Sequence, residues 1–186
     1  MQLVGELEQI DHEMGACDDQ VRRLCEGLSP EELCWRPAPK SWSIAENLVH
    51  LRITTEVFAP AAERAIRAAR EKDLLSQGPF PLGRMDRFFI WYVEPPPLMR
   101  LPAPKPLKPP LEESTAEGAL QEFLDSQELM IRQIHSANGV DLRRARVISP
   151  IASYIRMSLL AFFKVHPGHE RRHLWQMAKV REQLRS

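Results

Sequence analysis

The sequence has no excess charge of either sign, because lysine plus arginine and aspartate plus glutamate each number 25. A formal net charge of zero gives no sign of the basic surface that nucleic-acid-binding proteins carry. We therefore expect no nucleic-acid partner for this chain.

Cysteine and long apolar runs are also scarce. Cys17, Cys25 and Cys34 are an odd set without a CxxC pair, which predicts reduced thiols in a cytoplasmic protein. No apolar run approaches the roughly 18 residues that a membrane-spanning helix needs. The first six residues lack the basic start and apolar core of a signal peptide. We therefore expect no membrane partner.

The length of 186 residues suits one domain over residues 1–186, large enough to bury a core without disulfides. Apolar residues recur at spacings of three and four in four segments, which predicts an all-α four-helix bundle. The predicted helices cover residues 2–26, 43–72, 114–138 and 155–184. Pro60 predicts a kink in the second helix, and Pro167-Gly168 predicts a bend in the fourth.

Capping signals support these starts. Ser43 with Glu46, and Ser114 with Glu117, have the spacing of a capping box. Between the second and third helices lies a Pro-rich excursion over residues 77–112, too rich in proline for a continuous helix. Its apolar piece Phe88–Val93 predicts a short strand or extended segment that packs on the bundle.

Three of the six histidines fall within eight residues, as His166, His169 and His173. His169 and His173 are four apart, so on a helix they share one face and can reach one metal ion. His166 is an alternative ligand, while a lone buried histidine is more often bonded to backbone or carboxylate. Three imidazoles, with His50 as the third, would leave open positions on a divalent ion.

Two segments resemble the DinB-like family of metalloenzymes. The first is LSPEEL from Leu28 to Leu33 followed by WSIAENLVHL from Trp42 to Leu51, and the second is HERRHLWQ from His169 to Gln176. The resemblance spans most of the chain outside the Pro-rich excursion. It implies an antiparallel four-helix bundle in which His50, His169 and His173 hold a divalent metal ion such as zinc or nickel. It also implies, more weakly, a homodimer.

The function expected from the sequence is a metal-dependent enzyme, because such an ion lowers the pKa of a bound water or thiol. The family resemblance adds S-transfer with a low-molecular-weight thiol, and we expect transfer or hydrolysis on a small-molecule substrate. No residue stands out as a general base. The alternative is a non-catalytic metal-binding or protein-interaction bundle that uses the Pro-rich loop as its working surface.

Overall fold

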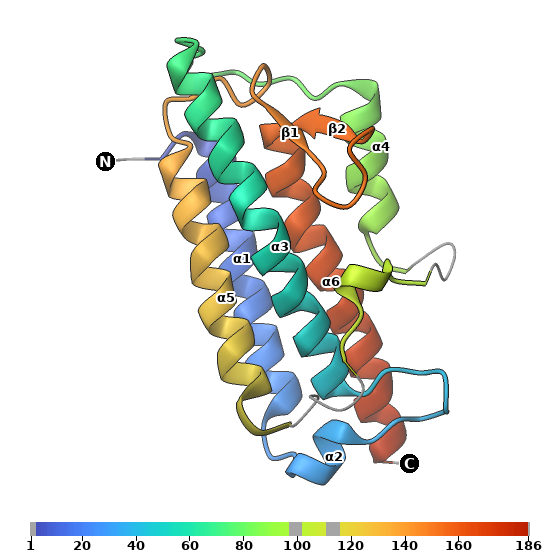
Figure 1. The fold of residues 1–186 in the computed structure, drawn as a ribbon. Helices are drawn as coiled ribbons and strands as arrows, with labels where there is room; N and C mark the ends of the chain where they lie inside the picture. Colours follow the sequence, from blue (N-terminus) through green and yellow to red (C-terminus); the bar gives the residue numbers. More distant parts are fainter. Residues whose placement is uncertain (1–2, 97–101, 111–115, 186) are drawn as a thin grey trace.

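The computed structural model describes residues 3–96, 102–110 and 116–185, and most of them are helical (Figure 1). Four long helices lie side by side, α1 (Gly5–Cys25), α3 (Ile44–Glu71), α5 (Ala116–Ser136) and α6 (Leu159–Leu184). Shorter elements connect them, α2 (Pro30–Cys34), α4 (Arg84–Val93), the 3-10 helix η1 (Lys105–Leu107), β1 (Arg146–Ile148) and β2 (Arg156–Ser158). The protein is therefore mainly helical, with one antiparallel two-stranded sheet that the sequence did not predict.

The long helices follow two directions. α1 and α6 run one way, and α3 and α5 run the other, because the excursion returns the chain to the end where α3 begins (Figure 1). α1 contacts α5 and α3 contacts α6, and in each of these pairs the two helices run in opposite directions. α3 also contacts α5 and α1 contacts α6, and in each of these pairs the two helices run in the same direction. None of the described helices combines the length and the apolar character that crossing a membrane requires.

The apolar stripe predicted for the first helix faces the core of the structure. Leu7, Ile10, Met14, Cys17 and Val21 are all buried. The helix is followed by Gly27 at a φ of 73°, a left-handed conformation that glycine adopts without steric cost. The predicted stripe and its end are therefore confirmed, with the helix starting at Gly5.

The start of α3 is set by the predicted capping box. Ser43 Oγ accepts from the Glu46 backbone N–H at 3.1 Å, and Glu46 Oε2 accepts from the Ser43 N–H at 2.9 Å. The helix continues through Pro60 to Glu71, close to the predicted end. The capping box predicted at Ser114 lies outside the described residues.

The start predicted for the fourth helix, near residue 155, is wrong. Residues 156–158 instead pair with residues 146–148 as a β-hairpin, and α6 begins at Leu159. Ser158 caps the helix by accepting from the Ala161 N–H at 3.1 Å, and Asp86 holds Ser158 through two hydrogen bonds. The hairpin thus wins over helix propensity because a distant carboxylate fixes the residue at the junction.

The extended conformation predicted for Phe88–Val93 is also wrong. This segment is part of α4, which packs on α6. Asp86 Oδ2 accepts from the Gly83 N–H at 3.3 Å and so caps the helix start. Phe89, Ile90 and Val93 are half-buried, whereas Phe88 and Trp91 are exposed, which is the spacing of one helical face. The aromatic run looked strand-like because both faces of this helix carry apolar residues.

Candidate metal centre

Two helices bring three histidines together. His50 comes from the first half of α3, and His169 and His173 come from neighbouring turns of α6. These three residues, the histidine trio, offer one ring nitrogen each, and the nitrogens all lie within 4.8 Å of one another. In the described part of the chain, no other trio of histidine, cysteine or carboxylate side chains converges this closely.

The trio lies in an aromatic and largely dry setting. His50 and His173 are only 3% and 6% exposed, whereas His169 is half-buried. Trp42, just before α3, stacks on His173 with ring centroids 5.9 Å apart and also contacts His50. His169 is thus the member of the trio closest to solvent, and Trp42 forms one wall of the site.

Two hydrogen bonds orient the imidazoles. His50 Nδ1 lies 2.6 Å from the Leu107 carbonyl oxygen, and His173 Nδ1 lies 2.8 Å from Asn47 Oδ1. Because a carbonyl oxygen only accepts, each Nδ1 carries the hydrogen, and each Nε2 keeps its lone pair for a metal. Leu107 belongs to η1 in the Pro-rich excursion, so that excursion helps to build the site.

Burial lowers the pKa of all three histidines, and it lowers the pKa values of His169 and His173 well below the usual value. The neighbouring imidazoles and the Arg172 guanidinium lower the pKa values of His169 and His173 further. The imidazoles are therefore neutral at neutral pH, which is the form that binds metal ions.

The donor set fits a divalent metal. Two imidazole nitrogens bound to one ion at roughly 2.0–2.1 Å each lie about 3.3 Å apart in a tetrahedral arrangement. His169 Nε2 and His173 Nε2 lie 3.2 Å apart. Imidazole ligands suit zinc, nickel, copper or iron. The trio could thus hold such an ion with positions left for other ligands.

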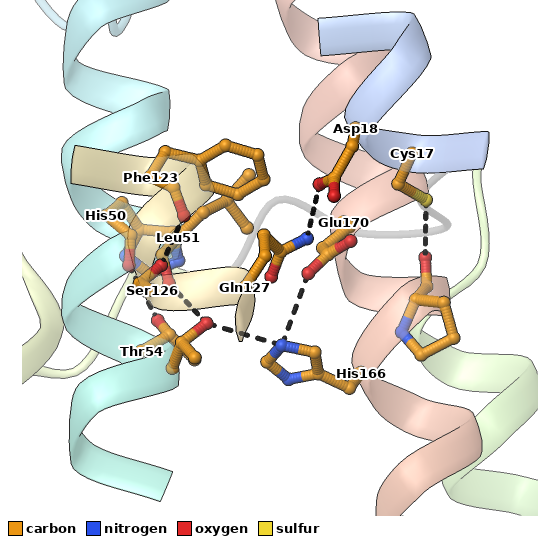
Figure 2. A network of polar contacts seen from close by, with 12 residues as sticks. Cys17, Asp18, His50, Leu51, Thr54, Phe123, Ser126, Gln127, His166 and Glu170 are labelled. Atoms are coloured by element: carbon orange, nitrogen blue, oxygen red, sulfur yellow. Dashed lines mark hydrogen bonds and ion pairs between the residues drawn. The ribbon is translucent and has the colours of Figure 1, made fainter. Parts of the chain in front are cut away.

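His166, the alternative ligand, lies about two turns before His173 along α6 and does not reach the trio. Its Nε2 lies 3.3 Å from Thr55 Oγ1 and 3.2 Å from Glu170 Oε1, the second contact without hydrogen-bond geometry (Figure 2). Pro167 does not end the helix, which runs unbroken from Leu159 to Leu184. The unwinding that would have let His166 displace a ligand is absent from α6.

Gly168 lies where the end of α4 meets α6, and this position has no room for a side chain. A Cβ at this position would come within 2.9 Å of Val93 Cγ2 and 3.0 Å of Glu94 Oε1. The end of α4 can therefore approach α6 closely only because Gly168 has no side chain. Arg171 then pairs with Glu94 and with Glu13, which ties α4 and α1 to the helix that carries two of the histidines.

Sequence reasoning missed several polar residues near the site. Glu170 is 1% exposed and lies between His166 and the pair formed by Gln127 and Asp18 (Figure 2). Asn47 and the Leu107 carbonyl were also missed as partners of the trio. Asn47 was detectable, because it lies one turn before His50 on the same helix. The Leu107 contact is not, because it depends on a loop 57 residues away.

The comparisons place these residues in a known family. The sequence pattern of the DinB superfamily matches residues 14–177. The chain belongs to the DinB superfamily. All three histidines of the trio lie inside the matched region of this DinB protein. No curated protein and no solved structure matches the chain.

The structure of this DinB protein also shows the contacts of Glu46 and Gln176. Glu46 was predicted to be a capping residue, and its carboxylate also binds Arg36 Nε at 2.7 Å. Gln176, the last residue of the second family motif, makes no hydrogen bond to the trio in the described part of the chain. Asn47 makes such a bond instead.

Proposed function

We propose that this protein is a metal-dependent enzyme in which His50, His169 and His173 hold a divalent ion. Zinc and nickel are the first candidates for this ion. The proposed reaction is transfer or hydrolysis on a small-molecule substrate, with water or a low-molecular-weight thiol as the attacking group. The observation that carries the proposal is the convergence of three imidazole nitrogens within 4.8 Å. The four long helices would form the four-helix bundle that the DinB resemblance implies.

The ion, when bound, would supply Lewis acidity that lowers the pKa of a coordinated water or thiol. The chain supplies the rest. Asn47 and the Leu107 carbonyl hold two imidazoles in one tautomer and orientation. Trp42 packs against the rings of His50 and His173. The half-buried position of His169 marks the side from which a substrate would enter.

The alternative, an interaction module built on the Pro-rich loop, has less support. Within that loop, residues 102–110 contact α3 through η1, where Leu107 is 5% exposed although most of its neighbours in this stretch are exposed. Its carbonyl is engaged by His50. Leu107 is therefore used inside the protein, where its carbonyl serves the histidine site.

The test is the metal content of tag-free protein by elemental mass spectrometry. We expect about one equivalent of a divalent ion per chain, lost in His50→Ala and in His169→Ala. His166→Ala is the matched control, because it removes a buried histidine of the same helix from outside the trio. If the wild type takes up no zinc or nickel on reloading, or if His166→Ala loses the ion like the trio variants, the assignment is wrong.

Catalysis is tested once the ion is identified. Metal-loaded protein is assayed for conjugation of a low-molecular-weight thiol to an electrophile and for hydrolysis of chromogenic esters. Activity that needs the ion and the trio supports the enzyme. Metal binding without either activity would favour a non-catalytic metal protein. The homodimer and the cytoplasmic location predicted from the sequence stay predictions, and sedimentation velocity measures the first.

A further inference from the structure

A hollow lies at the end of the protein remote from the histidine trio. It measures about 640 Å³ and is lined by the segments that follow α3 and α5. Figure 1 shows these segments at the same end of the protein as β1. Glu71, at the end of α3, is 21 residues beyond His50, or roughly 30 Å along a helix that rises about 1.5 Å per residue. The lining residues are Leu74, Ser76, Pro79, Phe80, Asp141, Arg143, Arg144 and Arg146. The hollow is thus separate from the site proposed above.

The turn at residues 142–144 and the first residue of β1 together present the three arginines of the hollow. Asp141 Oδ1 accepts the backbone N–H groups of Arg143 and Arg144 at 3.1 and 2.9 Å, and the Asp141 carbonyl accepts from Ala145 at 2.9 Å. Leu142, Ala145 and Val147 alternate with the arginines and are at most 2% exposed. These buried side chains anchor the backbone in the core, so the arginines are held at the surface on a fixed support.

The three arginines of the hollow form no ion pair with a carboxylate in the described part of the chain. No carboxylate lies within 4 Å of the guanidinium groups of Arg143, Arg144 or Arg146 among the residues that the structure describes. Other arginines of this chain do find such partners, as Arg36 and Arg171 show. The acidic residue that lines the hollow is Asp141, whose Oδ1 already accepts two backbone hydrogen bonds. The three arginine charges exceed the one Asp141 carboxylate in the lining, so the hollow keeps a net positive charge that favours an anion.

We propose that this hollow binds a small phosphorylated molecule through Arg143, Arg144 and Arg146. A planar guanidinium matches two phosphate oxygens at once, and charge-assisted bonds of this kind are stronger than neutral ones. The volume of about 640 Å³ leaves room for a small phosphorylated molecule. Leu74, Pro79 and Phe80 give the hollow an apolar wall for the organic part of a phosphate ester.

The test is isothermal titration calorimetry of the full-length protein with inorganic pyrophosphate at low ionic strength. The titration is repeated in the His169→Ala background, because pyrophosphate also ligates divalent ions. Binding in both backgrounds is the expected result, and it separates this hollow from the metal site. Binding that disappears with His169→Ala would assign the anion to the metal and overturn the proposal.

Two variants locate the binding. The double variant Arg143→Ala/Arg146→Ala is expected to weaken pyrophosphate binding at least about tenfold, because it removes two charge-assisted contacts. Arg23→Ala is the control, since it removes an exposed arginine in the last turn of α1, which is not part of the hollow. All of these arginines are exposed, so circular dichroism should show unchanged folding. Equal weakening in the double variant and in Arg23→Ala would mean a general charge effect and would contradict the site.

Two further ligands define the class. Tighter binding of adenosine diphosphate than of pyrophosphate, lost in the double variant, would assign an organic phosphate seated on the apolar wall. Equal affinities would assign the inorganic anion. Binding of single-stranded DNA without any binding of pyrophosphate or adenosine diphosphate would replace the proposal by a nucleic-acid surface and so overturn it.

Discussion

Asn47 Oδ1 accepts a hydrogen bond from His173 Nδ1 at 2.8 Å and so joins α3 to α6 beside the histidine trio. The orientation of this amide is fixed, because Asn47 Nδ2 donates to the Ser43 carbonyl at 2.8 Å. The oxygen must therefore face His173, whose Nδ1 carries the hydrogen and whose Nε2 is left with its lone pair. The first turn of α3 thus sets the tautomer of a histidine 126 residues away.

Replacing this amide tests the relationship. Asn47→Ala is expected to weaken divalent metal binding about 10–100-fold without changing the stoichiometry, because partners of ligating histidines have effects of this size. Competition with a chromogenic chelator measures the affinity. Asn47→Asp keeps an acceptor for His173 and should bind metal more tightly than Asn47→Ala. Equal affinities of wild type and Asn47→Ala would show that the contact does not support the site.

Gly168 should be intolerant of a methyl group. Gly168→Ala places a Cβ within 2.9 Å of Val93 Cγ2, so we expect a loss of about 1–3 kcal/mol in the free energy of unfolding. The control is Gly15→Ala, whose Cβ would meet nothing within 4 Å and which should gain about 0.5–1 kcal/mol from helix propensity. Urea denaturation measures both. Similar changes in the two variants would mean that α4 does not pack closely on α6.

The cysteines should differ in reactivity. Burial raises the pKa of Cys25 to about 11 and raises the pKa of Cys17 well above its usual value, with the nearby Glu170 carboxylate adding to the second shift. Cys34 is exposed, so it should supply the one fast-reacting thiol in a native titration with a disulfide reagent. Cys34→Ser should abolish the fast phase and Cys25→Ser should leave it intact. A fast phase that survives Cys34→Ser would place a reactive thiol in the bundle.

Asp18 makes stability depend on pH. Burial raises the pKa of its carboxyl to about 6, although the hydrogen bond from Gln127 opposes this shift. The folded state therefore favours the protonated carboxyl, and the contribution is complete below the ordinary pKa near 3.8 and lost as pH rises through about 6. Asp18→Asn should thus become more stable relative to wild type between pH 5 and pH 8.

Urea denaturation at the two pH values measures this difference for Asp18→Asn. Asp19→Asn serves as the control, because its carboxylate is exposed on the next residue of α1. Parallel pH profiles of Asp18→Asn and wild type would mean that the carboxyl is solvated and ionised throughout.

Elements with a strong local signal could be predicted from the sequence. The stripe from Leu7 to Val21 and the capping box at Ser43 were readable, because helical spacing and capping act over a few residues. The β-hairpin and α4 were not readable in this way. Both depend on Asp86, which caps α4 locally but also bonds Ser158, 72 residues along the chain.

The sequence by itself determined the helical class, the family and the three histidines, because periodicity and the motifs around His50 and His173 are local patterns. Only the tertiary structure decided that His166 turns toward Thr55 while His169 and His173 meet His50. It also brought the Leu107 carbonyl onto His50 and gathered three arginines at the far hollow. The physical reason is that these contacts join distant segments, and packing of whole helices, rather than any short stretch of residues, sets which side chains face one another.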